Sequence, residues 1–431
     1  MNTLLSVSIA LLAGLLMTRL FKPLKLPSVT AYLIAGVLVG PYCLGALGVP
    51  GLGFTSADAV SSLSLISEVA LGFIAFSIGN EFRLDDLKNT GKQALVIGIF
   101  QALVATLLVD LALVGVYYLM PGKISVAQAI TLGAIATATA PAATLMVVRQ
   151  YKAKGPLTSL LLPIVALDDA VGLIVFAVSF GVAKTLVTGT IDLISIFINP
   201  LLEIICSLIL GAVMGWVLTQ LEKLFNSNTN RLNLTIAVVF LTASLSMFDF
   251  HAGPFHISFS SLLVCMMLGT VFCNICSLSG DLMAASDKWT SPLFAVFFVI
   301  SGAELELSVF TDLAIVVIGL VYIIFRSLGK YLGTFISAKS VKCAPNICKY
   351  LGITLLPQAG VALGMCTTAM QLGDAGRLIR NITLFAVLIY ELFGPMFTKM
   401  ALTAAGDIKP MSDEVKHRRR MKLEAAQNEK K

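Results

Sequence analysis

Two adjacent carboxylates, Asp168 and Asp169, stand in the middle of an apolar run that extends from Pro156 to about Val182. An ionisable side chain at the centre of a membrane helix costs at least about 2.5 kcal/mol on insertion scales, so it indicates a functional site. Neighbouring residues of a helix point about 100° apart, because one turn takes about 3.6 residues. The pair therefore predicts two tasks: one carboxylate pairs with a nearby cation, and the other faces a cavity.

Two cations inside another apolar run could supply that partner. Arg326 and Lys330 are four residues apart and hence share one helix face. At about 1.5 Å per residue, Asp168 and Arg326 lie roughly 18 Å and Lys330 roughly 12 Å from the inner membrane face. Lys330 leans toward the midplane, because helical side chains tilt toward the N-terminus. Pairing with an aspartate is the favoured interpretation, and snorkelling to the interface is the alternative.

The composition predicts that the whole chain is a polytopic membrane protein. Hydrophobic residues make up 57% of it and charged residues only 13%, against about 25% charged in soluble domains. The first apolar run lacks the basic segment of a signal peptide and is expected to be a true span. The sequence contains no Walker motif, which argues against an ATP-driven pump. Nothing in it suggests nucleic-acid binding, and no cofactor is expected.

Apolar runs long enough to cross a bilayer predict about thirteen transmembrane helices. They cover residues 3–20, 27–41, 60–80, 93–119, 125–149, 156–183, 192–218, 231–248, 257–276, 290–309, 312–337, 347–372 and 377–402, and the second is expected to extend past Pro41. An N-terminus outside the cell places sixteen lysines and arginines on the inner side and four on the outer side. This asymmetry predicts an outer N-terminus and a cytoplasmic tail at 403–431.

Three pairs of segments recur at an offset of about 220 residues. Gly79-Asn-Glu81 matches Gly302-Ala-Glu304, Val96-Ile-Gly matches Val317-Ile-Gly, and Leu132-Gly matches Leu351-Gly. The offset corresponds to seven helices, an odd number, so the second copy would run through the membrane upside down. Two inverted six-helix repeats are typical of secondary transporters.

Two repeat-related helices carry interruptions. One contains Thr137-Ala-Thr139-Ala-Pro141, and the other contains Pro357-Gln358-Ala-Gly360. Unwound backbone is tolerated at membrane depth only where it is buried in protein or lines a cavity, and its carbonyls can hold ions. Thr137, Thr139 and Gln358 add side-chain oxygens at the same depth. An ordinary proline kink in each helix is the alternative.

The buried carboxylates predict exchange of protons and a small cation. A low-dielectric site disfavours the charged form of a carboxylate, so Asp169 or Asp168 could bind either a proton or Na⁺. Roles for Glu68, Asp110 and Glu391 stay open. Cys273 and Cys276 have the spacing of a metal or redox pair, but packing near a helix end is favoured. A pH-sensing role for His251 and His256 is the less favoured interpretation.

These motifs resemble the monovalent cation:proton antiporter superfamily, in the bacterial sodium/proton antiporter branch that carries paired aspartates. The resemblance runs to about residue 402 and rests on Ala166–Gly172, the Thr137–Pro141 break, Arg326–Lys330 and Pro357–Leu363. It implies electrogenic exchange of Na⁺ or Li⁺ for H⁺, with Asp169 as the main ion and proton carboxylate. It also implies that Asp168 is its neighbour and that Lys330 pairs with Asp168. The expected location is the inner (plasma) membrane of the cell.

The resemblance further implies a homodimer that works by elevator-like alternating access. The dimer domain would contain residues 1–80 and 231–309, and the mobile core would contain 93–183 and 312–402 with crossed, broken helices. Residues 192–218 would form the linker helix. The implied partners are the monovalent cation, protons, the lipid bilayer and a second copy of the chain.

One departure from the family leaves the cation undecided. Many relatives read Pro-Arg-Gly-Glu-Val where this chain reads Pro357-Gln-Ala-Gly360-Val, so an acidic and a basic residue are missing. A K⁺/H⁺ exchanger and a sodium-coupled organic-anion symporter are the alternatives within transport. An intramembrane aspartyl protease needs aspartates from two helices, and a channel needs a filter motif. Both are disfavoured by this sequence.

Overall fold

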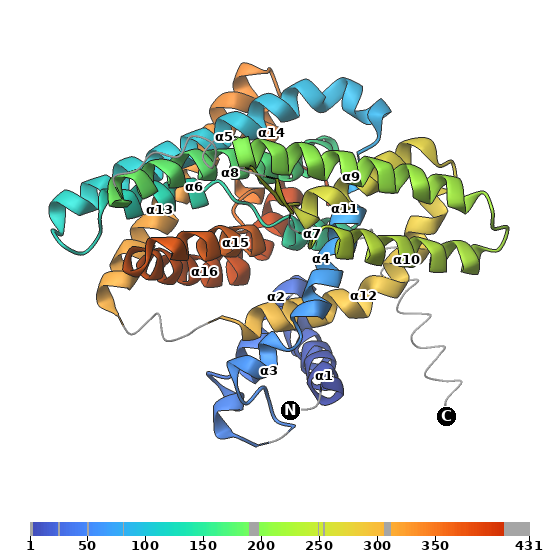
Figure 1. Ribbon diagram of the computed structural model, residues 1–431, viewed down its shortest axis with the longest axis horizontal. Helices are drawn as coiled ribbons and strands as arrows, with labels where there is room; N and C mark the ends of the chain where they lie inside the picture. Colours follow the sequence, from blue (N-terminus) through green and yellow to red (C-terminus); the bar gives the residue numbers. More distant parts are fainter. Residues whose placement is uncertain are drawn as a thin grey trace.

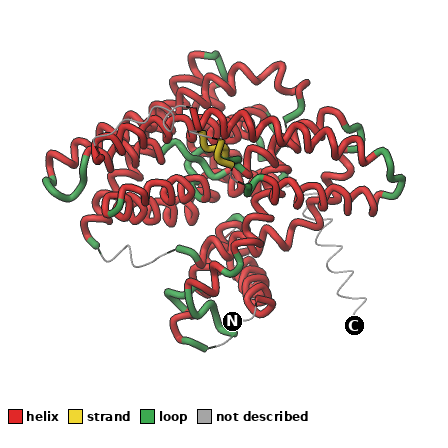
Figure 2. Tube along the Cα trace, viewed as in Figure 1, coloured by secondary structure: helices red, strands yellow, loops and turns green. Residues whose placement is uncertain are grey.

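The computed structural model describes residues 3–24, 26–49, 51–80, 82–188, 198–248, 250–252, 255–305 and 312–408. Helices make up nearly all of it (Figure 2). The helices of the N-terminal half are α1 (Thr3–Phe21), α2 (Ser28–Val39), α3 (Ala57–Ser61), α4 (Ser64–Gly79), α5 (Leu84–Leu119), α6 (Val126–Ile135), α7 (Pro141–Tyr151), α8 (Pro156–Thr188) and α9 (Asn199–Glu222). Those of the C-terminal half are α10 (Asn228–Leu245), α11 (Ser261–Ile275), α12 (Ser279–Ala303), α13 (Leu313–Ser340), α14 (Pro345–Thr354), α15 (Gly360–Ala369) and α16 (Asp374–Ala405).

Seven of the helical segments in the described residues are long and apolar enough to cross a membrane on their own. They are Thr3–Leu24, Ser28–Leu47, Gly91–Leu119, Pro156–Val187, Leu201–Glu222, Leu313–Ser340 and Asp374–Ala405. Each of the thirteen predicted spans contains helix, but the count of thirteen crossings stays a prediction. The second predicted span extends past Pro41 to Leu47, as expected, but not as one helix: α2 ends at Val39, and a separate 3₁₀ turn forms at Leu44–Leu47.

Both predicted interruptions are real breaks in the helices. The segment between Ile135 and Pro141 separates α6 from α7, and the segment between Thr354 and Gly360 separates α14 from α15. Pro141 begins α7, where its missing N–H costs nothing. The two breaks meet directly, because the Ala140 N–H donates to the Pro357 carbonyl at 2.8 Å. The unwound segments of two distant parts of the sequence are thus side by side.

A small hairpin departs from the all-helical prediction. β1 (Phe250–Ala252) and β2 (Phe255–Ile257) pair antiparallel, with His251 opposite His256. Apolar residues alternate with histidine in both strands, which is the period of two that favours a strand. Figure 2 shows the hairpin in yellow against the helices. The side chains of the two histidines lie outside the described residues, so the pH-sensing interpretation stays untested.

The helices form two groups around the breaks. α5 and α13 lie side by side and, with α6, α8 and α14–α16, build one group (Figure 1). α1, α2, α4 and α9–α12 form the other group. One hydrophobic cluster joins the groups, because side chains of α7 and α8 pack with side chains of α2, α4 and α10–α12. Function therefore has to be sought where α8 meets both groups.

Asp407, just after α16, closes the first turn of α8. Its carboxylate is buried and accepts hydrogen bonds from the Thr158 N–H at 2.6 Å and the Thr158 hydroxyl at 2.7 Å. The Asp407 carbonyl accepts from the Lys154 N–H at 3.0 Å. A carboxylate at this place satisfies free N–H groups and complements the helix dipole. The far end of the chain thus completes the helix that carries Asp168 and Asp169.

Glycines let the helices of the second group touch through their backbones. A Cβ on Gly36 of α2 would lie 2.0 Å from the Val299 carbonyl oxygen of α12, and one on Gly302 would lie 2.2 Å from the Leu33 oxygen. α4 and α11 meet in the same way. A Cβ on Gly79 would lie 1.9 Å from the Met266 oxygen, and one on Gly269 would lie 2.2 Å from the Phe76 oxygen. Small residues at such crossings are typical of membrane helix packing.

We expect Gly36→Ala to destabilise the protein by about 1–3 kcal/mol, because the new methyl group forces two backbones apart. The measurement is thermal unfolding of the purified protein in detergent. Gly115→Ala is the matched control, since a Cβ there meets open space within helix α5. Equal unfolding temperatures for both variants would contradict the backbone contact.

Candidate functional site

Helix α8 presents its two carboxylates to different surroundings. Asp168 follows Leu161, Ile164 and Val165 around the helix, and these side chains pack in a core formed with α5, α7, α13 and α14. Asp169 follows Leu162 and Ala166, which pack in the cluster that joins the two helix groups. The helical period alone produces this separation. Asp168 therefore faces its own group, and Asp169 faces the boundary between the groups.

Asp168 is fully buried, and its carboxylate accepts hydrogen bonds from three side chains. Lys330 of α13, also fully buried, donates to Oδ2 at 3.0 Å, and the Thr139 hydroxyl donates to the same oxygen at 2.6 Å. The Gln101 amide of α5 donates to Oδ1. Lys330 thus lies against an aspartate and not at the membrane interface. The structure brings these four side chains together from α5, α8, α13 and the first break.

Asp169 is buried as well, at 4% exposure, but its carboxylate is not satisfied. Oδ1 has no hydrogen-bond partner in the part of the chain that the structure describes. A buried carboxylate without a partner has to bind a proton or a cation. Asp169 is therefore the carboxylate of the pair that is available to a ligand.

The two cations of α13 bind the carbonyls of the breaks. Arg326 is fully buried and donates to the carbonyls of Ala136 at 3.0 Å, Ala138 at 2.6 Å and Leu356 at 2.8 Å. Lys330 donates to the Thr137 carbonyl at 2.6 Å. Freed carbonyls of this kind can hold ions. Four of them accept hydrogen bonds from Arg326 and Lys330, and ion binding by the breaks stays a prediction.

Thr137 and Gln358 belong to the same region without contacting either aspartate through a described hydrogen bond. The Thr137 hydroxyl donates to the Ala134 carbonyl at 2.7 Å, and a Cβ on Gly172 of α8 would lie 3.0 Å from it. Gly172 is one turn after Asp169, so Thr137 borders the same face of α8. Gln358 donates to the Ile135 carbonyl and to the Tyr322 hydroxyl, both at 2.9 Å, which ties the second break to the first.

Sequence reasoning missed three residues of this network. Gln101 contacts Asp168, Tyr322 contacts Gln358, and the ring of Tyr390 lies 4.4 Å below the Arg326 guanidinium. The available signal for Gln101 was an amide in an otherwise apolar run, which costs free energy unless it is hydrogen-bonded. Nothing in the sequence indicated which helix the amide would face.

The other carboxylates whose roles were left open lie away from the aspartate pair. Glu68 is exposed on α4. Asp110 of α5 lies against Gly133 of α6, where a Cβ would collide with its Oδ1, and this oxygen has no described partner. Glu391 of α16 is buried with an unpartnered Oε2. Glu81 falls outside the described residues.

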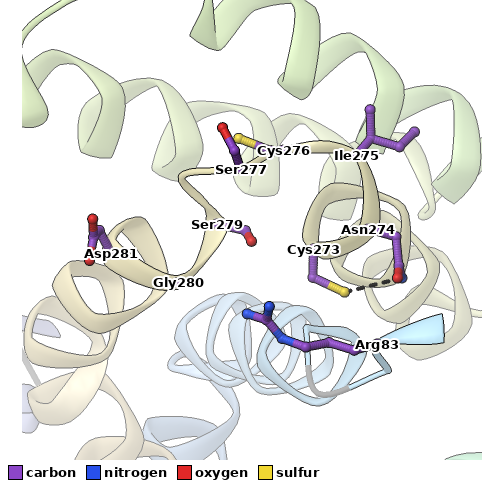
Figure 3. Close-up of a pocket in the computed structure, with 9 residues that line it drawn as sticks. All are labelled: Arg83, Cys273, Asn274, Ile275, Cys276, Ser277, Ser279, Gly280 and Asp281. Atoms are coloured by element: carbon purple, nitrogen blue, oxygen red, sulfur yellow. Dashed lines mark hydrogen bonds between the residues drawn. The ribbon is translucent and has the colours of Figure 1, made fainter. Parts of the chain in front are cut away.

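A pocket of about 420 Å³ lies where α11 turns into α12 (Figure 3). It is lined by Arg83, Cys273, Asn274, Ile275, Cys276, Ser277, Ser279, Gly280 and Asp281, so no residue of the aspartate network borders it. The two thiols point in different directions in Figure 3. The Cys273 sulfur contacts the carbonyls of Gly79 at 3.8 Å and Phe82 at 3.6 Å. Neither cysteine forms a disulfide.

Two known antiporters are similar to this chain, one over nearly its full length and one over more than half of it. The Na(+)/H(+) antiporter NhaS4 of Synechocystis sp. is 24% identical over 417 residues, which cover 93% of this chain and 96% of that protein. The High-affinity Na(+)/H(+) antiporter NhaS3 of the same organism is 23% identical over 57% of this chain and 58% of its own length.

Solved structures share the fold. Two structures of the sodium proton antiporter MjNhaP1 from Methanocaldococcus jannaschii superpose with TM-scores of 0.64 and 0.70, each at 17% identity. They cover 92% and 94% of this chain and 97% and 98% of their own. This likeness concerns the arrangement of the helices.

The family profile described as "Sodium/hydrogen exchanger, transmembrane" matches residues 7–404. This span includes the aspartate pair, both breaks and the two buried cations. Its members are transporters and not enzymes, and the apolar helices agree with a multi-pass membrane protein. The chain belongs to the transmembrane sodium/hydrogen exchanger family.

Proposed function

We propose that this protein exchanges Na⁺ or Li⁺ for H⁺, with Asp169 as the carboxylate that binds the cation and the proton in turn. The observation that carries the proposal is the contrast within the pair: Asp168 is saturated by three donors, and Asp169 has a free oxygen at the boundary between the helix groups. A proton and a hard monovalent cation compete for such an oxygen. Competition at one site couples their opposite movements.

Asp168 and Lys330 supply the second part of the mechanism. Both are fully buried, and their ion pair leaves Asp169 without a cation in direct contact among the described residues. Cation binding at Asp169 places a further positive charge beside Lys330, which favours loss of a proton from the lysine. Two protons would then move for each cation, and the exchange would be electrogenic.

Alternating access would proceed by an elevator movement of the group that contains α5, α8 and α13 against the other group (α1, α2, α4 and α9–α12), which we call the dimer group because it would form the homodimer contact. Polar contacts at one end of the boundary support a discrete closed arrangement: Arg149 of α7 pairs with Asp287 of α12, and Gln150 accepts from the Ser28 N–H at 2.7 Å. A homodimer built on residues 1–80 and 231–309 would hold the second group still. Residues 192–218 would link the halves, although 189–197 lie outside the described residues.

Inverted repeats are part of the same proposal. The repeat relates α2 to α11 and α4 to α12. Its support is the exchange of partners in the glycine contacts, where α2 packs on α12 and α11 packs on α4. The lysine and arginine asymmetry supports an outer N-terminus in the plasma membrane. The tail from 409 to 431 lies outside the described residues.

A K⁺/H⁺ exchanger is the second candidate. A Cβ at Gly360 would meet nothing within 4 Å, so the glutamate of many relatives is replaced here by open space. A roomier site with fewer charged ligands would suit a larger, more weakly hydrated cation. An aspartyl protease is not proposed, because Asp168 is fully engaged and both aspartates belong to α8.

We expect Asp169→Asn to abolish cation-driven proton flux in proteoliposomes, because the amide cannot bind a proton and a cation in turn. The measurement compares Na⁺, Li⁺ and K⁺ gradients with a pH-sensitive dye. Glu68→Gln, an exposed carboxylate of α4, is the control and should retain flux. Full flux in Asp169→Asn would exclude it as the binding carboxylate.

Lys330→Ala should weaken folding and alter the charge movement. Loss of one partner leaves Asp168 buried and unpaired, which costs about 3–5 kcal/mol for a buried ion pair. We expect a lower unfolding temperature and the loss of electrogenic exchange when the membrane potential is clamped. Wild-type charge movement and stability would remove the ion pair from the mechanism.

A charge swap tests the contact between the groups. Arg149→Asp alone should shift the apparent cation affinity by less than about tenfold, since a partly exposed pair contributes up to about 1 kcal/mol. The double variant Arg149→Asp, Asp287→Arg should return toward wild type. Additive effects of the two changes would show that the residues are not coupled during transport.

A further inference from the structure

Glu391 is a buried carboxylate with an unpartnered oxygen that the proposed exchange does not use. It lies near the middle of α16, which runs from Asp374 to Ala405. Glu391 follows Asp168 by 223 residues, the offset that also separates Gly79 from Gly302. It therefore stands in the second half of the chain where Asp168 stands in the first. Its exposure is 6%, and its Oε2 has no hydrogen-bond partner among the described residues.

The neighbours of Glu391 do not neutralise it. In the described part of the chain, no Lys, Arg or His lies within ion-pair distance of its carboxylate. Arg326 lies over the adjacent Tyr390 ring but uses its donors on three backbone carbonyls. Glu304, an exposed residue that follows α12, is near enough for its like charge to disfavour ionised Glu391. Glu391 therefore cannot remain ionised without a ligand.

The remaining elements packed on α16 also carry ionisable groups. These are Tyr32 of α2, Arg149 and Tyr151 of α7, Asp168, Asp169 and Lys184 of α8, Tyr322, Lys330, Tyr331 and Lys339 of α13, Cys348, Lys349 and Tyr350 of α14 and Cys366 of α15. Among them, Arg149 and Lys330 already pair with carboxylates elsewhere. Lys349 lies over the ring of Tyr350.

Glu391 lies near the second break and near the contact between the two helix groups. Gly394, one turn later, packs on Pro357 of the second break, where a Cβ would lie 3.0 Å from the Pro357 Cα. Leu392 packs against both the core of the first helix group and the cluster that joins the groups. Glu304 belongs to the dimer group. The two glutamates thus belong to opposite sides of the same boundary.

We propose that Glu391, with Glu304 nearby, forms a second proton-binding site at the contact between the helix groups, separate from Asp169. A proton is the ligand that fits best, because it neutralises one carboxylate and needs no shell of further oxygens. A like charge nearby also favours a proton on a buried carboxylate. The role of the site in transport rests on the proposed exchange function, since a movement of one group would separate the two glutamates.

Infrared difference spectroscopy of the purified full-length protein tests the site directly. The carbonyl stretch of a protonated carboxylic acid is followed during a pH titration, in H₂O and in D₂O. We expect wild type minus Glu391→Gln to contain one titrating acid band, and Glu391→Asp to retain one. Glu304→Gln should move the pH at which the band disappears. Glu68→Gln, which removes an exposed glutamate, should leave the spectrum unchanged.

The outcomes separate this site from the proposed exchange. No difference in acid bands between wild type and Glu391→Gln, with both proteins eluting as folded particles, would overturn the proton site. An unmoved titration in Glu304→Gln would overturn the pairing. Failure of the exchange proposal has another signature, namely full flux in Asp169→Asn, and that result leaves the acid band of Glu391 in place.

Discussion

The rest of the site depends on two cations that hold two broken helices together. Arg326 binds carbonyls on both sides of the crossing, two from the first break and one from the second. Lys330 adds a third carbonyl of the first break and then reaches Asp168. Unwound backbone inside a membrane has no water to satisfy it. These donors therefore make the breaks possible, and the breaks in turn bring Thr139 and Gln358 to the centre of the molecule.

This arrangement sets the charge of the site. Four carbonyl dipoles, which could have served a cation in transit, are used to keep Arg326 and Lys330 buried. The Lys330 ammonium also donates hydrogen bonds to Asp168 and to the Thr139 hydroxyl. Of the described side chains in this network, Asp169 is left with negative charge that no protein cation cancels by direct contact. In the proposed exchange, selectivity would therefore rest on Asp169 and on the space around it.

The sequence was sufficient for features that depend on depth and period. The breaks followed from Pro141, Pro357 and Gly360, and the approach of Lys330 to an aspartate followed from counting residues along two helices. Asp168 as the partner was implied by the family resemblance. The partners of Arg326 could not be predicted, because they depend on how two breaks cross. Gln101 was missed because its direction depends on the rotation of α5 against α8. Helices α6, α7, α14 and α15 contain 10, 11, 10 and 10 residues, so length alone cannot assign them as spans.

The cap that Asp407 places on α8 has a consequence for biosynthesis. The helix that carries the aspartate pair is made in the first half of the chain, yet its first turn is closed by a residue that follows the last helix. The cation beside Asp168 also arrives late, from α13. While ribosomes are still translating the second half, α8 has to stay in the membrane with two uncompensated carboxylates and an open N-terminus. The network around Asp168 is thus complete only after α16 has been made. A nascent chain released before α13 lacks the ion pair between Lys330 and Asp168.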